Sequence, residues 1–238
     1  MKKIIYVLCF LFILQMVQPY SLYASSKQLV AIGDSIPYGY NLSKDNQYPS
    51  GKAFPYMVGE KAGLEVTNLG VPGLTSQELV AAVHENEVFR STLRDADYVV
   101  LYIGGNDLLN LLKKHKGIKG IEMDEVAIVV RNLLFNVYST VMELDKLTNG
   151  QILVYNIYNP YPEKGKSLGQ PLHYINVQYS SLIELLSHFT EVKLVDAYQA
   201  FKGHPEYILK DDVHPTVEGQ IVLANIGLKE IKEGGTDS

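Results

Sequence analysis

A serine stands directly after a short apolar run, a position that suits a catalytic nucleophile. Residues 29–32 are apolar and β-prone, and Gly33-Asp34-Ser35 follow at once. This pattern predicts a buried strand that ends in a tight turn, where Gly33 supplies backbone freedom. A serine hydroxyl becomes an effective nucleophile only when a base takes its proton. The alternative is a structural turn in which Asp34 and Ser35 cap the next helix.

A histidine near the C-terminus has neighbours that suit it to be that base. Asp211 lies three residues before His214, and Pro215 follows. We expect the Asp211 carboxylate to hold Nδ1 of the imidazole and to turn Nε2 towards Ser35. Pro215 favours the start of a helix at this point. Asp211 and the adjacent Asp212 could instead form a solvated acidic pair, but the spacing favours Asp211 as the partner of His214.

Two further predicted strands end in residues of interest, Gly70 and Asn106. Residues 64–69 alternate between apolar and polar, and residues 96–103 are largely apolar or aromatic. Because the carboxyl ends of parallel strands meet at one edge of a sheet, Ser35, Gly70 and Asn106 can converge there. Taken singly, Gly70 could simply make a turn and Asn106 could simply cap a helix.

Strands and helices alternate along the chain, which predicts one α/β domain with a mostly parallel, five-stranded sheet. The remaining strands are expected at 151–157 and 192–195. Helices are expected at 53–62, 75–83, 108–112, 123–147, 173–189 and 216–231. Loops are expected at 36–51 and 159–171.

The N-terminus has the three parts of a secretory signal. Lys2 and Lys3 precede the apolar run 4–14, and the small-residue segment 21–26 follows. The apolar run is shorter than the roughly 20 residues that span a bilayer, although an uncleaved anchor is the alternative. We therefore expect a signal peptide over 1–26, a single domain over 27–238, and a secreted or envelope-associated protein.

Composition excludes several kinds of chemistry once this leader is removed. The only cysteine is Cys9, so the mature chain has no disulfide and no cysteine nucleophile. Loss of Lys2 and Lys3 makes the formal net charge of −5 still more negative, which disfavours nucleic-acid binding. No other segment is expected to cross a membrane. No metal and no cofactor is expected, and structural or surface roles are expected for His84, His115, His173, His188 and His204.

Together these motifs resemble the SGNH (GDSL) hydrolase family. They occur in the family's order and the resemblance spans residues 30–231; the motifs are Gly33-Asp34-Ser35, Asn68-x-Gly70, Gly104-x-Asn106-Asp107 and Asp211-x-x-His214-Pro215. The resemblance implies a flavodoxin-like, three-layer α/β/α sandwich. It also implies hydrolysis of esters, thioesters or O-acetyl groups.

The resemblance further implies a role for each motif residue. Ser35 would be the nucleophile, His214 the general base and Asp211 the orienting acid. The oxyanion hole would consist of the Ser35 and Gly70 backbone N–H groups and the Asn106 side-chain amide. Asp34 and Asp107 are interpreted as structural, hydrogen-bonding the turns that carry Ser35 and Asn106.

The leading hypothesis is a secreted serine esterase or lipase-like hydrolase that acts on a small-molecule or lipid ester. The alternatives are a polysaccharide or peptidoglycan O-acetyl esterase and a catalytically silent envelope binding protein. The Tyr- and Pro-rich segment 155–162 could line an acyl pocket or could pack on the surface. The sequence does not predict the oligomeric state or the acyl chain length.

Overall fold

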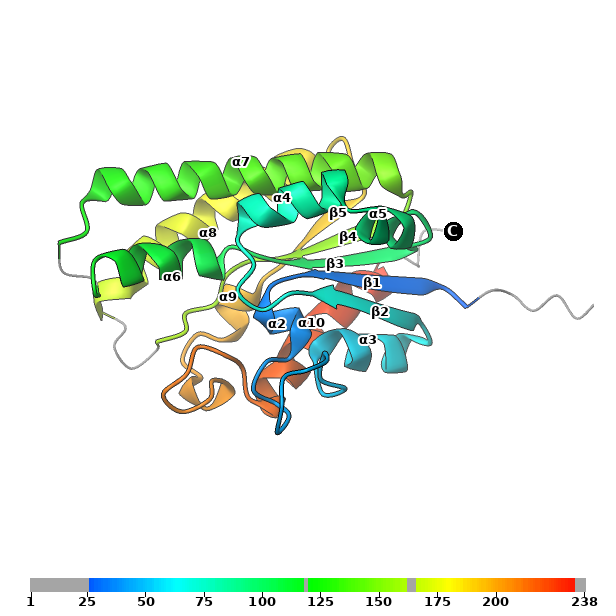
Figure 1. Cartoon of the computed structure of the whole chain (residues 1–238), viewed down its shortest axis with the longest axis horizontal. Coiled ribbons are helices and arrows are strands. Elements are labelled where there is room, and N and C mark those ends of the chain that lie inside the picture. The colour runs from blue at the N-terminus through cyan, green and yellow to red at the C-terminus, as the bar shows by residue number, and fades with distance from the viewer. Residues whose placement is uncertain (1–25, 118–119, 162–165, 234–238) are drawn as a thin grey trace, which may run out of the picture.

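The computed structural model describes residues 26–117, 120–161 and 166–233, so all but the last residue of the predicted signal peptide lies outside it. Elements are numbered as in Figure 1. The described residues form one sheet of strands in the order β2-β1-β3-β4-β5, and every neighbouring pair is parallel. This is the flavodoxin-like strand order, so the predicted fold is confirmed. The strands are β1 (Gln28–Gly33), β2 (Glu65–Gly70), β3 (Tyr98–Tyr102), β4 (Gln151–Tyr155) and β5 (Val192–Val195).

The central strands are almost entirely apolar after their first residue because both of their faces are buried there. In β1, Val30 and Ile32 belong to the core on one side of the sheet, and Leu29 and Ala31 belong to the core on the other. Strands β3 and β4 alternate between the two cores in the same way. The alternation follows from the two-residue repeat of a β-strand.

Helices cover both faces of the sheet and complete the three layers (Figure 1). One face carries α4 (Ser76–Glu85), α5 (Glu87–Arg94), α7 (Met123–Leu147) and α8 (Lys166–Leu186). The other carries α2 (Ser35–Tyr38), α3 (Phe54–Ala62), α9 (Ala197–Ala200) and α10 (Val217–Glu233). Helix α6 (Gly105–Lys114) lies beyond the carboxyl end of β3, and a 3₁₀ helix, η2, spans Pro205–Tyr207.

Two predicted helix boundaries are confirmed by the hydrogen bonds that define them. Thr75 forms a capping box with Glu78, so α4 begins where a helix was expected to start. Gly63 ends α3 in the left-handed conformation at φ 69°. The long helix α7 has the predicted bounds, Met123–Leu147.

Two predicted loops are partly helical, and one helix was not anticipated. Of the predicted loop 36–51, the first three residues belong to a short, fully buried helix, α2, and the rest has no helix or strand. Helix α8 begins at Lys166, so Pro171 lies inside a helix where a loop was expected. Pro171 is the sixth residue of α8, and its missing N–H removes one hydrogen bond from the second turn. Helix α5 was not anticipated; Asn86 caps it by accepting from the N–H groups of Val88 and Phe89.

Helix α7 also corrects the expectation that no segment after the leader could span a bilayer. By length and composition it is the one helix among the described residues that could do so. Its inner face nevertheless packs on the sheet and forms part of the core through Val130, Leu133, Val137, Val141 and Leu144.

Candidate active site

The turn after β1 places Ser35 at the edge of the sheet. Gly33 has φ 135°, and a Cβ there would lie 1.9 Å from the Tyr102 carbonyl oxygen, so only glycine fits. The Asp34 N–H donates to that same carbonyl at 3.2 Å. Asp34 Oδ1 accepts from the Ile36 N–H at 2.9 Å, which confirms the predicted turn-stabilising hydrogen bond. Ser35 then begins α2 and is 9% exposed.

The end of β2 holds α2 in position. Asn68 donates from Nδ2 to the Pro37 carbonyl at 2.7 Å and accepts from the Gly70 N–H at 3.0 Å. A Cβ on Gly70 would lie 3.0 Å from Tyr38 N and 3.1 Å from the Asp34 carbonyl oxygen, so a larger residue would have to push this backbone aside by a few tenths of an ångström. The Gly70 N–H donates to Asn68 here, and its expected role as an oxyanion donor stays a prediction.

His214 lies between a carboxylate and the Ser35 hydroxyl. Its Nε2 is 2.9 Å from Ser35 Oγ, and its Nδ1 is 2.6 Å from Asp212 Oδ1. The ring of Tyr40 packs on the imidazole with 5.0 Å between centroids. The structure therefore brings together the predicted serine and histidine, which lie 179 residues apart in the sequence.

The prediction that Asp211 is the partner of His214 is wrong, because Asp212 occupies that place. The Asp212 N–H donates to the Leu209 carbonyl at 3.1 Å, and the Leu209 N–H donates to the His214 carbonyl at 2.9 Å, so the chain reverses here. Asp211 is exposed in this turn at φ 58°. This turn brings the Asp212 carboxylate, and not that of Asp211, to the imidazole.

Asp212 accepts hydrogen bonds from three donors. Asn41 Nδ2 lies 2.7 Å from Oδ2, and the Val213 N–H lies 2.6 Å from Oδ1, which also contacts His214. Partial burial raises the pKa of Asp212, but the hydrogen bonds from Asn41, Val213 and His214 together hold it below its usual value. Sequence reasoning missed Asn41, and its separation of 171 residues from Asp212 leaves no local pattern that could reveal it.

Asn106 lies in the first turn of α6, at the edge that Ser35 also occupies. Its Nδ2 donates to the Leu74 carbonyl at 2.9 Å, and the amide retains a second N–H. Asp107 accepts from Ser76 N at 3.0 Å and from Ser76 Oγ at 2.6 Å, so it joins α6 to the start of α4. Burial raises the pKa of Asp107, and hydrogen bonds from Ser76 and from its own backbone oppose that shift; the last of these is the expected bond to its own turn.

A cavity of about 160 Å³ opens beside Ser35 and Asn106. Asp34, Tyr102 and Gly105 also line it, and the rest of its lining is mostly apolar. These walls come from α2, α6, the start of α7 with the residue at 121, residues 157–161, the first turns of α8 and the residue before His214. The residues are Ile36, Leu108, Leu109, Leu111, Leu112, Ile121, Met123, Val126, Ile157, Tyr158, Pro160, Tyr161, Pro171, Leu172, Ile175 and Val213.

A carboxyl group that lines this cavity, that of Asp34, ionises less readily than an ordinary carboxyl group. Burial raises the pKa of Asp34 to about 7; the hydrogen bond from Ile36 opposes this shift and the nearby Asp107 adds to it. Burial also raises the pKa of the Tyr102 and Tyr158 hydroxyls, so both stay uncharged. Among the described lining residues, Asp34 is therefore the one whose charge changes near neutral pH.

The other described histidines are not arranged like His214. His115 contacts Glu125 at 2.7 Å and His204 contacts Glu206 at 2.7 Å, both on the surface and neither beside a serine. His84 lies 3.8 Å from Glu143. In the described parts of the chain, no group of three or more His, Cys, Asp or Glu side chains could hold a metal ion.

Known proteins resemble this chain in sequence and in fold. An acetylxylan esterase from Geobacillus stearothermophilus is 27% identical over 87% of this chain and 94% of its own length. An uncharacterized protein, YpmR, from Bacillus subtilis (strain 168) is 23% identical over 87% of this chain and 82% of its own length. The crystal structure of the lipase Lip_vut3 from a goat rumen metagenome superposes with a TM-score of 0.71, covering 88% of this chain and 98% of that one at 22% identity.

A family model covers most of the chain and includes most of the site. The model of the GDSL-like lipase/acylhydrolase family matches residues 31–221, which contain Ser35, Asn106 and His214. The predicted family is therefore confirmed. The chain belongs to the GDSL-like lipase/acylhydrolase family and is a carboxylic ester hydrolase of that family.

Proposed function

We propose that the protein is an exported serine esterase that hydrolyses carboxylic esters through an acyl-enzyme on Ser35. The observation that supports this most directly is the line of contacts from Asp212 through His214 to the Ser35 hydroxyl, beside an apolar cavity. Family membership limits the chemistry to acyl transfer.

Acylation begins when Ser35 Oγ attacks the ester carbonyl carbon and Nε2 of His214 takes the hydroxyl proton. The Asp212 carboxylate holds Nδ1–H and stabilises the imidazolium. The bond from the carbonyl carbon to the alcohol oxygen then breaks, and His214 gives its proton to that oxygen. A water molecule next attacks the acyl carbon and transfers a proton to His214, which returns it to Ser35 as the free acid leaves.

Two donors are positioned to bind the oxyanion of the tetrahedral intermediate. The Ser35 N–H is the first of α2 and has no acceptor inside the helix. The second N–H of the Asn106 amide is the other candidate. Removal of one such donor typically costs about 2.7–4 kcal/mol of barrier. Gly70 would contribute only if its hydrogen bond to Asn68 were broken or shared.

Hydrolysis of short and medium p-nitrophenyl esters by Ser35→Ala and His214→Ala proteins tests these roles. Each variant should lose a similar factor, on the order of 10⁴ or more, because nucleophile and base act as a unit. His204→Ala is a matched control, since His204 also pairs with a carboxylate but lies away from Ser35. A Ser35→Ala protein as active as the wild type would overturn the assignment.

A fluorophosphonate probe separates this proposal from a catalytically silent binding protein. Such a probe reacts with an activated serine, so the wild type should gain one adduct by mass spectrometry and Ser35→Ala should gain none. An unlabelled wild-type protein that still binds envelope material would support the silent binding protein.

A polysaccharide O-acetyl esterase is the second candidate, favoured by the similarity to the acetylxylan esterase. Acetate release from acetylated xylan and from O-acetylated peptidoglycan would be compared with hydrolysis of longer acyl esters. Fast acetate release with no activity on longer chains would favour this candidate over the general esterase.

Export is proposed from the leader pattern of residues 1–26 alone. The expected mature N-terminus follows Ala24 or Ser26. Expression in a bacterial host, followed by N-terminal mass spectrometry of the culture medium and of the membrane fraction, tests this. An uncleaved chain found only in membranes would indicate an anchor.

A further inference from the structure

Helix α6 presents four leucines to the cavity, and of these Leu108 also packs against the core. Leu108, Leu109, Leu111 and Leu112 all line the cavity, and no residue of α6 is fully buried. Transfer of an acetyl group does not need an apolar wall of this length. The arrangement therefore points to a larger apolar group that enters beside Ser35.

The positions of the catalytic groups indicate which part of an ester would enter. In the proposed mechanism, His214 gives a proton to the leaving alcohol, so the alcohol must lie on the His214 side of Ser35. His214 is in contact with Tyr40 and Asp212 and is not among the residues that line the cavity. With the carbonyl oxygen directed to the Ser35 N–H and Asn106, the acyl chain is the part that faces the cavity.

The cavity volume sets the length of chain that it can enclose. Its volume is about 160 Å³, and a cavity of about 150 Å³ lined by Leu, Ile and Phe accommodates benzene, a molecule of six carbons. We propose that this cavity is an acyl-chain site and that the enzyme prefers esters of medium-chain acids, of roughly six carbons, to acetate esters. This inference rests on the proposed function and specifies its substrate class.

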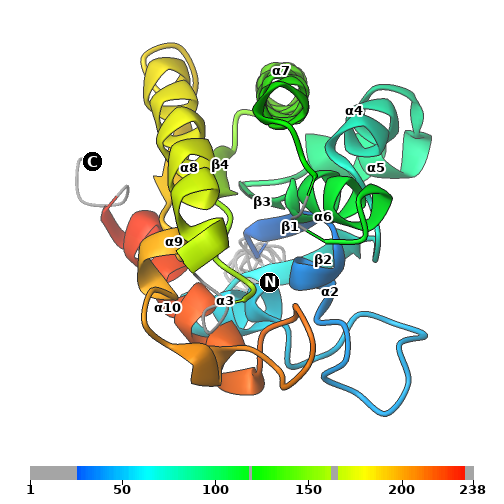
Figure 2. The same cartoon turned by 90° about the vertical axis from the view of Figure 1, so that its left-hand side faces the viewer.

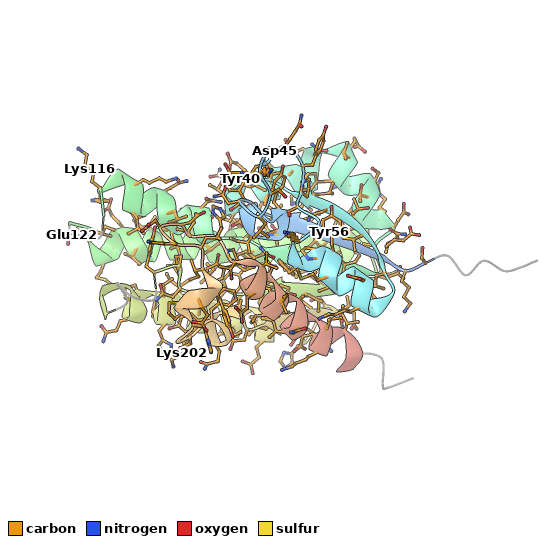
Figure 3. The ribbon with its side chains drawn as sticks, turned by 90° about the horizontal axis from the view of Figure 1, so that it is seen from below. Tyr40, Asp45, Tyr56, Lys116, Glu122 and Lys202 are labelled. Atoms are coloured by element: carbon orange, nitrogen blue, oxygen red, sulfur yellow. The ribbon has the colours of Figure 1, made fainter. Side chains whose placement is uncertain are left out.

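Leu112 lies where the chain length would be sensed. It is six residues after Asn106, which is about 9 Å along the helix axis. Ile121 and Met123, which follow the C-terminal end of α6 in the chain, also line the cavity. Figure 3 labels Lys116 and Glu122 at this end of the molecule, and Figure 2 looks onto this end, with α8 on the left, α6 on the right and α7 at the top.

A chain-length series tests the proposal in the wild type. The kcat/KM for p-nitrophenyl acetate, butyrate, hexanoate, octanoate and decanoate should rise by up to roughly fourfold per methylene until about six carbons, and then level off. A parallel series of acetate esters with longer alcohols should show no such rise. A rise that follows the alcohol would overturn the assignment of the cavity to the acyl chain.

Variants of Leu112 test whether the cavity is the cause. Leu112→Trp should lower the hexanoate-to-acetate ratio of kcat/KM at least tenfold, and Leu112→Ala should move the optimum to longer acids. Leu185→Trp is the matched control, because Leu185 is 59% exposed on α8 and does not line the cavity. Equal ratios in Leu112→Trp, Leu185→Trp and wild type would overturn the proposal.

A binding measurement separates failure of this inference from failure of the proposed function. The Ser35→Ala protein should bind dansyl-undecanoate with increased fluorescence, and octanoate should displace the probe. In the double variant that also carries Leu112→Trp, the affinities for the probe and for octanoate should each fall tenfold or more. Ser35-dependent hydrolysis of acetate without chain preference or fatty-acid binding would refute the acyl site alone. Fatty-acid binding that depends on Leu112, in a protein that hydrolyses no ester, would support the acyl site and refute the proposed function.

Discussion

Substitution of the two adjacent aspartates separates the geometry of this site from the spacing expected of its motif. Asp212→Asn keeps the shape of the side chain but removes its charge and replaces one acceptor oxygen with a donor. Asn41 donates to Oδ2, and its own Oδ1 already accepts from Asn46 at 3.0 Å, so it cannot turn without losing that bond. The variant therefore loses the charge and at least one hydrogen bond. Asp211→Asn removes an equal charge from an exposed neighbour.

The size of the effect follows from the contact with His214. During acylation the imidazole becomes positively charged, with its Nδ1 2.6 Å from Asp212 Oδ1. Two unit charges about 4 Å apart interact by about 4 kcal/mol at an effective dielectric constant near 20. Loss of that interaction corresponds to about a 10³-fold fall in kcat, and the equivalent change in a serine protease costs about 10⁴. Asp211→Asn should change kcat less than about threefold, as expected for exposed charges.

The assay is steady-state hydrolysis of p-nitrophenyl hexanoate at pH 8, together with the rate of fluorophosphonate labelling. Thermal unfolding of each variant shows whether the fold is retained. A 10³-fold loss in Asp211→Asn with near-normal activity in Asp212→Asn would refute the geometric argument. That result would show that Asp211, three residues before His214, is the acid that orients the histidine.

Three further substitutions test the framework around the site. The folded pKa of Asp34, about 7, exceeds its unfolded value of 3.8, so the stability that Asp34 contributes falls by up to about 4 kcal/mol as pH rises from about 4 to 7. Urea unfolding at pH 5 and pH 8 should show this loss in the wild type and not in Asp34→Asn, and an equal loss in both proteins would contradict the reasoning. Gly33→Ala should destabilise the protein by more than about 4 kcal/mol in urea unfolding, because its Cβ would overlap the Tyr102 carbonyl; native stability would refute this. Asn176→Leu removes three buried hydrogen bonds, two of them to Ile157, and should cost about 3 kcal/mol or more by the same measurement, with a value under about 1 kcal/mol as the contrary result.

The sheet could be predicted because its signals are local. Near-continuous apolar runs mark β1, β3 and β4, and each ends in a glycine or polar turn that stops the strand. Parallel pairing then carries the residues that follow β1 and β3 to the same edge without any knowledge of the loops. Ser35 and Asn106 meet at one cavity for this reason.

The acid could not be predicted, because it depends on a turn that spacing alone does not reveal. Asp211 adopts φ 58°, a conformation that few residues other than glycine tolerate, although aspartate is among them. With this residue in the left-handed conformation, the Asp212 carboxylate contacts His214 and the Asp211 carboxylate faces solvent. Asn41 was missed for a related reason, since it comes from a loop 171 residues away from Asp212.

The motif residues divide into those that face the reaction and those that hold them in place. Gly33, Asn68 and Gly70 secure α2 through close backbone approaches and hydrogen bonds. The apolar cavity walls come from the leucines of α6, from residues 157–161 and from the starts of α7 and α8, all of which lie outside the recognised motifs. The motifs can therefore identify acyl transfer at Ser35, whereas the proposed choice of acyl chain depends on side chains that no motif includes. For this reason, similarity to an acetylxylan esterase is compatible with a preference for longer acids here.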